Sequence, residues 1–377
     1  MDWKIQLFQL NYTQEEKNAV NSVLDSGWLT MGDNIKQFES NFSALIGPNI
    51  HSVAVSSATA ALHLALLAFD IQEDDEVIIP SLTFVADANV VSMVKGKIVF
   101  ADCTSLDDWS ISLKSIESKI TKKTKVLMVC HFAGYPCDMK PIKELCAKHN
   151  IKLIEDASHA PGASVDNLSC GAWGDINCFS FFTNKNLSVG EGGMLTTVNP
   201  IYAERLRFLR SHGMSSATLE RHKGRAISYD VIIPGLNYRM DEIRAALGLV
   251  QLKKLQQSND KRKLLTKRYR TNFMSSPIAI PYSIDNKKYQ SAYHVLPVLL
   301  PRNSDRLEII NGMKAGGIQT SIHYPPFWDF AAYKDICKPE DMPITAEICR
   351  RELTLPLYPN MTFDQVDIVC KTLIDMV

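Results

Sequence analysis

The stretch VAVSSATAALHLALLAF, residues 53–69, decides the fold class of this chain. Val53–Val55 is a short apolar run with two β-branched residues, which favours a buried strand. Two serines follow, and Ala58–Phe69 is then rich in alanine and leucine, which favour a helix. A strand that leads directly into a helix predicts a βαβ unit, in which the helix connects two parallel strands.

The same alternation of apolar runs and helical patterns continues along the chain. We expect further helices at Val85–Val94 and Met139–His149. We expect further strands at Glu76–Pro80, Lys97–Ala101, Val126–Cys130, Lys152–Glu155, Asn177–Phe181 and Gly193–Thr197. Such an order is typical of an α/β protein whose central sheet is mainly parallel and covered on both faces.

The pattern changes near residue 240. One long helix is predicted from about Met240 to Arg270, because apolar residues recur there at helical spacing: Ile243, Leu247, Val250, Leu252 and Leu255. Beyond it, the segments Ala292–Leu300, Ile318–Ile322 and the helix-like Phe363–Met376 indicate a smaller α+β domain. We therefore predict a large domain over residues 1–250 and a small C-terminal domain over residues 251–377.

The composition indicates which binding partners and which cellular compartment to expect. The 377 residues include 41 basic and 41 acidic side chains, so no net charge draws the chain to nucleic acid or to an anionic membrane. No apolar run approaches the roughly 20 residues of a membrane span. The nine cysteines are scattered and never spaced C-x-x-C, which is typical of reduced thiols. We expect a cytoplasmic protein without nucleic-acid or membrane partners.

In an open α/β sheet, ligands bind beyond the carboxyl ends of the strands, so polar residues at these points are the candidates for a site. The first group is Ser56-Ser57-Ala58-Thr59, at the expected start of a helix. Free N–H groups and hydroxyls there favour a phosphate, although a simple serine N-cap explains the same residues. The chain contains neither GxxxxGK[ST] nor GxGxxG, so no motif indicates that it binds a nucleoside triphosphate or a dinucleotide.

The second group is Asp156, at the end of the strand Lys152–Glu155. A buried carboxylate needs a cationic partner, which a protonated pyridine nitrogen, a salt bridge or a metal ion would supply. Asp156 and His159 alone are too few ligands for a metal site, so no metal is predicted. The alternative that Asp156 simply caps the turn after the strand remains open.

The third group surrounds Lys185, which follows an apolar strand in the uncharged stretch Phe179–Asn186 and precedes Gly190-Glu191-Gly192-Gly193. Most lysines are solvated surface residues, and a lone one would be interpreted in that way. Burial and a cationic neighbour would lower its pKa and make it a nucleophile. The fourth group, Asn237-Tyr238-Arg239, by itself indicates only the start of the long helix.

The order of these groups suits pyridoxal phosphate. A phosphate cup comes first, an aromatic side chain (Phe84) follows the next strand, and Asp156 precedes Lys185 by 29 residues. Helix-start amides suit the phosphate, an aromatic face suits the ring, and an anion keeps the ring nitrogen protonated. A lysine suits the aldehyde.

The chain resembles the DegT/DnrJ/EryC1/StrS family of sugar aminotransferases, which are fold-type I enzymes similar to aspartate aminotransferase and dependent on pyridoxal phosphate. The resemblance covers nearly the whole chain and is carried by motifs at their expected places: Ser26–Thr30 with Gly32 and Phe38-Glu39, Ser57–Leu62, Pro80–Phe84, Glu155–Ala160, Ser180-Phe181 through Lys185-Asn186, Gly190–Gly193, Gly235–Met240 and His323–Pro325.

The resemblance implies a role for each matching position. Lys185 would form the Schiff base with the cofactor, and Asp156 would pair with its ring nitrogen. His159 would meet the ring hydroxyl, and Phe84 would stack on the ring. The phosphate would be held by Ser57, Ala58, Thr59 and Ser180, and by Asn237 from the neighbouring subunit of a homodimer. Trp28, Thr30, Phe182, His323 and Tyr324 fall in stretches that line the sugar side.

Two positions depart from the family pattern. Ala58 stands where the phosphate cup usually has glycine, which is tolerable if the backbone φ is negative there. Phe182 stands where histidine is frequent, which puts in doubt the face presented to the substrate.

The implied reaction moves an amino group from glutamate to a keto-sugar by a ping-pong mechanism, with Lys185 as both cofactor anchor and proton carrier. Phe181–Lys185 and Gly190–Met194 resemble members that act on C4 of a nucleotide-linked 4-keto-6-deoxy sugar. Amination at C3 and acceptors without a nucleotide stay open. A cofactor-binding regulatory protein and a dehydrating relative are other classes, but Lys185 with Asp156 argues against the first, and a dehydrating relative is expected to lack this lysine.

Overall fold

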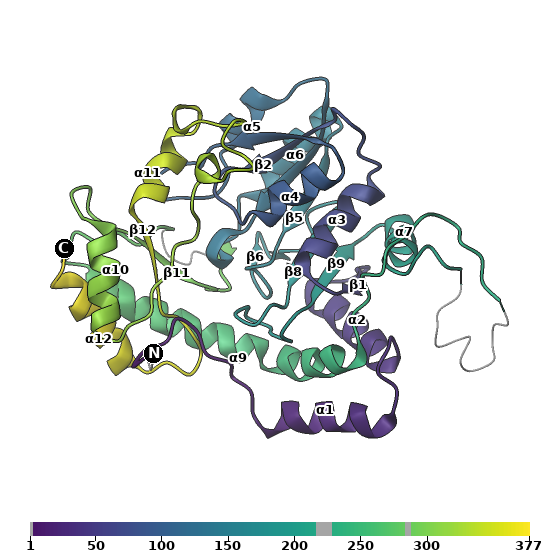
Figure 1. The fold of residues 1–377 in the computed structure, drawn as a ribbon, viewed down its shortest axis with the longest axis horizontal. Helices are drawn as coiled ribbons and strands as arrows, with labels where there is room; N and C mark the ends of the chain where they lie inside the picture. Colours follow the sequence, from purple (N-terminus) through teal and green to yellow (C-terminus); the bar gives the residue numbers. More distant parts are fainter. Residues whose placement is uncertain (1–2, 216–227, 283–287) are drawn as a thin grey trace.

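The central feature of the fold is a seven-stranded sheet in the order β1-β9-β8-β5-β4-β2-β3 (Figure 1). The computed structural model describes residues 3–215, 228–282 and 288–377. The strands are β1 (His51–Val55), β2 (Glu76–Pro80), β3 (Lys97–Ala101), β4 (Thr124–Cys130), β5 (Lys152–Asp156), β8 (Ile176–Ser180) and β9 (Gly193–Thr197). Only β9 is antiparallel to its neighbours, so the carboxyl ends of the other six strands lie at one edge.

Helices cover both faces of this sheet, because successive strand residues point to opposite sides. Ile79 packs with α3 (Ala58–Ala68) and α4 (Ala86–Met93), and the same face carries α7 (Pro200–Arg210). Ile78 packs with α5 (Leu113–Lys119) and α6 (Met139–His149) on the other face. That face also carries α2 (Asp33–Ile46) and the first half of α9 (Glu242–Phe273). Because both faces of the sheet are buried, its strands consist almost entirely of apolar residues.

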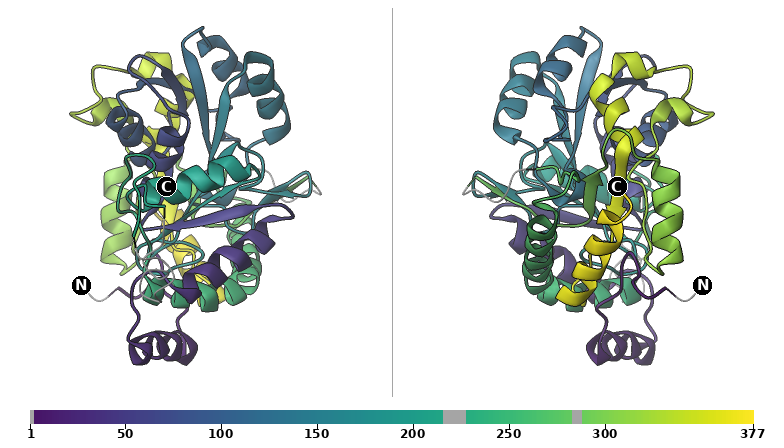
Figure 2. Two further views of the ribbon diagram at one scale, coloured as in Figure 1. Left: turned by 90° about the vertical axis from the view of Figure 1, so that its right-hand side faces the viewer. Right: turned by 90° about the vertical axis from the view of Figure 1, so that its left-hand side faces the viewer.

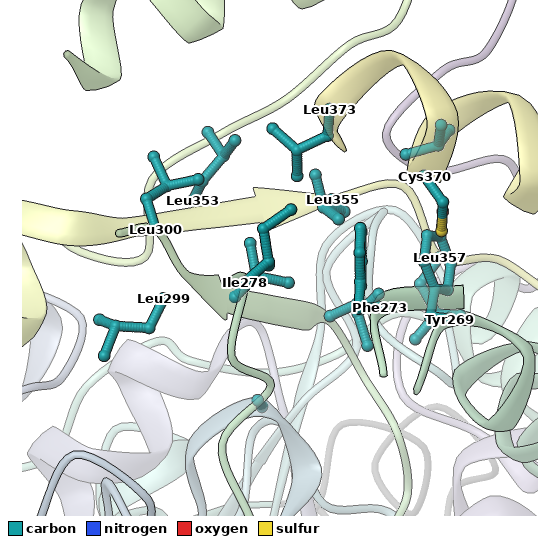
Figure 3. Packing of buried hydrophobic residues seen from close by; sticks show 14 of the residues in the cluster. Tyr269, Phe273, Ile278, Leu299, Leu300, Leu353, Leu355, Leu357, Cys370 and Leu373 are labelled. Atoms are coloured by element: carbon teal, nitrogen blue, oxygen red, sulfur yellow. The ribbon is translucent and has the colours of Figure 1, made fainter. Parts of the chain in front are cut away.

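The C-terminal part of the chain has its own two-stranded sheet, in which β11 (Leu296–Leu299) is antiparallel to β12 (Glu352–Leu355). Helices α10 (Arg306–Ala315), α11 (Pro343–Arg351) and α12 (Phe363–Ile374) surround it. Tyr269 and Phe273 of α9 pack against Leu355 and Leu373 from this part (Figure 3). The long helix α9 therefore joins the two cores.

Smaller elements complete the fold. A three-stranded sheet contains β6 (Ser164–Val165), β7 (Leu168–Ser169) and β10 (Tyr289–Gln290). Single 3-10 turns lie at η1 (Phe132–Gly134), η2 (Phe327–Asp329) and η3 (Pro339–Asp341). Helix α1 (Gln14–Ser26) packs on α9 and lies at the lower edge of both views in Figure 2. Within the part of the chain described here, no helix is long and apolar enough to cross a membrane.

The predicted α/β fold with a mainly parallel sheet is confirmed, and several elements begin and end where the sequence indicated. The bounds of β2, β3, β9 and α6 match the predicted ones. The segment Ile318–Ile322 forms only isolated pairings, of Ile318 with Ile5 and of Ser321 with Thr354. The partner of β11 is instead β12, which the sequence pattern missed. Residue 250 lies inside α9, and the division into two domains stays a prediction.

Candidate active site

A cavity of about 300 Å³ lies at the carboxyl-end edge of the central sheet. Eleven of the fourteen predicted site residues line it. They are Ser57, Ala58, Thr59, Phe84, Asp156, His159, Ser180, Phe182, Lys185, His323 and Tyr324. Strands β1, β5 and β8 end here, so residues that are far apart in sequence meet because their strands are neighbours in the sheet.

The start of α3 forms one wall of the cavity. Ser57 is its N-cap and its hydroxyl accepts the N–H of Ala60, at 3.1 Å. The first N–H groups of a helix have no intrahelical acceptor, so those of Ala58 and Thr59 stay available to a ligand at the positive end of the dipole. Ala58 does not have a positive φ, which satisfies the condition for replacing glycine. A side chain at Gly193 would collide with the Ser57 carbonyl, at 2.5 Å.

Asp156 and Lys185 lie in the same cavity, at the ends of β5 and after β8. Asp156 is 5% exposed, and its Oδ1 accepts the N–H of Ser158 at 3.0 Å. Burial lowers the pKa of Lys185 to about 8, and the negative charge of Asp156 limits this decrease. About a tenth of the Lys185 amine is therefore uncharged at pH 7, far more than for an ordinary lysine, and this fraction can act as a nucleophile.

The loop that carries Lys185 is held on both sides. The Thr183 hydroxyl donates to the Gly190 carbonyl at 3.2 Å, and the N–H of Lys185 donates to the Phe182 carbonyl at 2.9 Å. The Asn186 amide donates to Asn259 and to the carbonyl of Ala292. The glycine-rich turn and α9 thus fix the backbone from which Lys185 projects.

His159 is buried as a neutral imidazole. Burial, followed by the charges of Lys185 and His323, lowers its pKa well below the usual value. Its Nδ1 accepts the N–H of Ala133 at 3.2 Å, so the ring proton lies on Nε2, which is 3.1 Å from the Tyr324 hydroxyl. His159 therefore presents a fixed tautomer and orients Tyr324.

Aromatic rings surround the mouth of the cavity. The rings of Phe84 and Tyr324 have centroids 5.5 Å apart, and Phe84 is 53% exposed. Phe182 is 44% exposed and its backbone pairs with Gly190. Ser180 is buried, and its hydroxyl accepts the N–H of Phe182 at 3.3 Å. A flat ligand can enter between these rings.

Three predicted residues do not line the cavity: Trp28, Thr30 and Asn237. Trp28 is half-buried and donates from its ring to the Met31 carbonyl at 3.2 Å, whereas Thr30 is exposed. Asn237 is also exposed, in a segment that pairs with Ser211. Within one chain these side chains are outside the site.

Sequence reasoning missed other residues of the lining: Leu62, Ala86, Cys130, Ser158, Asn184, Glu191 and Gly192. Cys130 ends β4, so the rule that ligands bind at strand ends could have found it. Glu191 and Gly192 belong to the glycine-rich stretch Gly190–Gly193, which the sequence indicated as a motif without assigning it a role in the site. The Oδ1 of Asn184 is buried and has no hydrogen-bond partner among the described residues.

Comparison with known proteins identifies the family of this chain. The chain matches the DegT/DnrJ/EryC1/StrS aminotransferase family over residues 11–374. It belongs to this family. The spore coat polysaccharide biosynthesis protein SpsC of Bacillus subtilis is 37% identical to it over 372 residues, which cover 97% of this chain and 95% of SpsC.

Solved structures agree with the assignment. Spr1654 of Streptococcus pneumoniae, assigned as a sugar aminotransferase, superposes in its pyridoxamine-phosphate form with a TM-score of 0.91 at 28% identity, over 97% of each chain. PseC of Helicobacter pylori, an aminotransferase of pseudoaminic acid biosynthesis, superposes with a TM-score of 0.90 at 26% identity, over 100% of this chain and 99% of PseC. The predicted family, its fold-type I fold, the aminotransferase class and the pyridoxal phosphate cofactor are confirmed.

Proposed function

We propose that this aminotransferase moves an amino group from glutamate to a keto-sugar, in two half-reactions at one site. The observation that carries the proposal is the convergence of Lys185, Asp156 and the Ser57–Thr59 helix start on one cavity. We propose a nucleotide-linked 4-keto-6-deoxy sugar as the acceptor. The names of SpsC, a spore coat polysaccharide biosynthesis protein, and of PseC, an aminotransferase of pseudoaminic acid biosynthesis, support a sugar as the acceptor.

The residues present fit pyridoxal phosphate. The amides of Ala58 and Thr59, with the hydroxyl of Ser180, would hold its phosphate, and the buried Asp156 would face its ring nitrogen. Lys185 would hold its aldehyde carbon. When bound, the cofactor withdraws electrons from the amino-bearing carbon of the substrate. The chain supplies an anion, an amine and helix-start amides, which are the three kinds of group that this cofactor needs.

Lys185 would act as the proton carrier. Its pKa of about 8 means that the amine can both accept and return a proton near neutral pH. Its place on a held loop limits its reach to the cavity, so it can remove a proton from the α-carbon of the amino donor. Phe84 and Phe182 at the mouth would exclude water from this transfer.

A homodimer with shared sites is part of the proposal. Asn237 lies outside the cavity of its own chain and is exposed, which suits a residue that serves the neighbouring subunit. The adjacent Tyr238 carbonyl accepts the Ser56 N–H of the same chain at 2.8 Å, which holds the segment of Asn237 beside the phosphate cup. Two rigid copies of this edge could complete each other's phosphate site.

The first test uses glutamate alone. The purified yellow protein should lose its visible absorbance with glutamate and release 2-oxoglutarate in an amount that matches the protein sites. Lys185→Ala serves as the control and should give neither change. An unchanged spectrum in the wild-type protein would favour a regulatory, non-catalytic protein and overturn the proposal.

The second test identifies the acceptor. The glutamate-treated protein is mixed with 4-keto-6-deoxy and 3-keto sugars, each with and without a nucleotide, and the return of visible absorbance is followed. We expect the nucleotide-linked 4-keto-6-deoxy sugars to restore it fastest. Faster recovery with a 3-keto or a nucleotide-free sugar would show that the acceptor is a different sugar. It would not contradict the proposed aminotransferase activity.

A further inference from the structure

His323 lines the active-site cavity and is bonded on its far side to β12. Its backbone N–H donates to Oε2 of Glu352 at 2.9 Å, and its Nδ1 is 2.8 Å from the Thr354 hydroxyl. The Thr354 hydroxyl is in turn 2.5 Å from Oε1 of Glu352. Because Nδ1 is engaged, Nε2 is the ring nitrogen left to the cavity.

Glu352 and Thr354 form a closed polar unit within an apolar core. Both are fully buried, and residues two apart on a strand point to the same face. The pairing of Ser321 with Thr354 holds the segment of His323 alongside β12. Neither side chain lines the active-site cavity, but both contact His323, which does.

Counting protons links Glu352 to the tautomer of His323. The Thr354 hydroxyl has one proton, so it donates in one direction only. If Glu352 is ionised, Thr354 donates to it and accepts from Nδ1–H, and Nε2 is then a bare acceptor. If Glu352 is protonated, it donates to Thr354, Thr354 donates to Nδ1, and Nε2 carries the proton.

Several charges surround this unit. Burial raises the pKa of Glu352 to about 8, against the hydrogen bonds from Thr354 and the His323 N–H and the positive charge of Arg306. The Arg306 guanidinium bonds the backbone carbonyls of Cys349 and Glu352 rather than the carboxyl group. The neighbouring hydroxyl of Tyr324 and thiol of Cys349 both have raised pKa values and stay neutral.

The imidazole itself is uncharged at neutral pH. Burial, with the charge of Lys185, lowers the pKa of His323 to about 4. The two other histidines on this side, His159 and His294, also have pKa values well below the usual one and are neutral. At neutral pH the carboxyl group of Glu352 is mostly protonated, so the proton count selects the form of His323 with Nε2–H.

We propose that Glu352 and Thr354 are positioning residues that fix His323 as an Nε2–H donor toward an oxygen atom of the keto-sugar. The acceptor half of this statement rests on the proposed function. The Glu352–Thr354–His323 relay would favour an acceptor with an oxygen at that point of the cavity and disfavour one that offers a donor there. Above about pH 8 the relay reverses, and Nε2 loses its proton to Nδ1.

The decisive measurement is the ¹⁵N spectrum of the histidine side chains in the cofactor-loaded protein without substrate, because the two tautomers differ clearly. His323→Gln assigns the signal. We expect protonated Nε2 at neutral pH in the wild-type protein and a change to protonated Nδ1 above about pH 8. Protonated Nδ1 at neutral pH in the wild-type protein would overturn the proposal, and this readout does not depend on turnover.

Variants separate the relay from simple packing. Glu352→Gln should keep Nε2 protonated at every pH, because its amide nitrogen donates to Thr354 and its oxygen accepts the His323 N–H. Thr354→Val should remove the preference, whereas the matched Thr354→Ser keeps the hydroxyl and the wild-type spectrum. A pH-dependent tautomer in Glu352→Gln would contradict the relay. The wild-type titration decides the proposal if a variant fails to fold.

Kinetics extend the test to the substrate. The KM for the keto-sugar should rise about three- to tenfold above about pH 8 in the wild-type enzyme and stay flat in Glu352→Gln. A KM that does not change with pH in the wild-type enzyme, although the tautomer changes as expected, would show that Nε2–H does not contact the sugar. Failure of every acceptor would instead remove the proposed function and leave the spectroscopic result intact.

Discussion

Carboxyl oxygens of Asp87 and Asp156 lie within 4.8 Å of each other beneath the active-site cavity. The Thr83 hydroxyl donates to Oδ2 of Asp87 at 2.6 Å, and Oδ1 has no partner among the described residues. Burial, followed by the charge of Asp156, raises the pKa of Asp87 well above its usual value. Asp87 therefore favours its neutral form next to Asp156, the residue that we propose faces the cofactor nitrogen.

Replacing Asp87 by asparagine should change how stability depends on pH. A carboxyl group whose pKa is raised by folding stabilises the native state fully below its unfolded pKa, and this contribution is lost as pH rises through the folded pKa. Asp87→Asn has no such proton and keeps the acceptor for Thr83. We expect it to match the wild type below about pH 4 and to gain an advantage of about 1 kcal/mol for each pH unit above that, up to the folded pKa of Asp87, in urea unfolding of the cofactor-free protein. A variant that is less stable at higher pH would contradict the neutral state of Asp87.

The lowered pKa of Lys185 should make it react before other lysines. Reductive methylation with formaldehyde of the cofactor-free protein at about pH 7 should modify Lys185 first, because its pKa is about 8 and that of an ordinary lysine is 10.5. Mass spectrometry of the peptides gives the order of reaction. Pre-loading with pyridoxal phosphate should protect only this site. Equal labelling of Lys185 and exposed lysines such as Lys36 would show that its pKa is not lowered.

Glu242 should be needed to stabilise the first turn of α2. Through this turn it should also hold the preceding segment, Trp28–Thr30, in place. Its carboxylate accepts the N–H groups of Gly32, Asn34 and Ile35 at 2.8, 2.9 and 3.0 Å, where the helix has no side-chain cap of its own. Glu242→Ala leaves these donors unsatisfied and should cost about 2–4 kcal/mol in the free energy of unfolding.

The control for this prediction is Asp241→Ala, which removes the single cap bond of α9 and should cost about 1 kcal/mol. If the two variants lose the same stability in urea titrations, Glu242 does no more than an ordinary cap.

Shared active sites can be tested by complementation. Homodimers of Lys185→Ala and of Asn237→Ala should each have weak activity, because every site in them carries the substitution. Mixed dimers should recover about a quarter of the wild-type rate, because half of the dimers are mixed and each has one intact site. The two variants are unfolded and reassembled together to form the mixed dimers. If the activity then only equals the sum of the two parent activities, Asn237 belongs to the site of its own chain.

The amino-acid sequence by itself determined the elements whose signal is local. Apolar runs fixed β2, β3 and β9 at their observed bounds, and residue types at strand ends selected Asp156 and Lys185. These predictions hold because strand burial and helix amphipathicity act over a few neighbouring residues. The family motifs extended them to most of the cavity lining.

Only the tertiary structure decided which of the other polar groups act together. Asp87 of α4 meets Asp156 of β5 across 69 positions of sequence, and Glu352 meets His323 across 29, through tertiary contacts that no local pattern encodes. Their protonation follows from burial, since a carboxyl group removed from water is neutral unless a cation compensates it. The sequence therefore selected Lys185 and Asp156 as the candidate pair, and the packing of the chain decided the protonation of the groups around them.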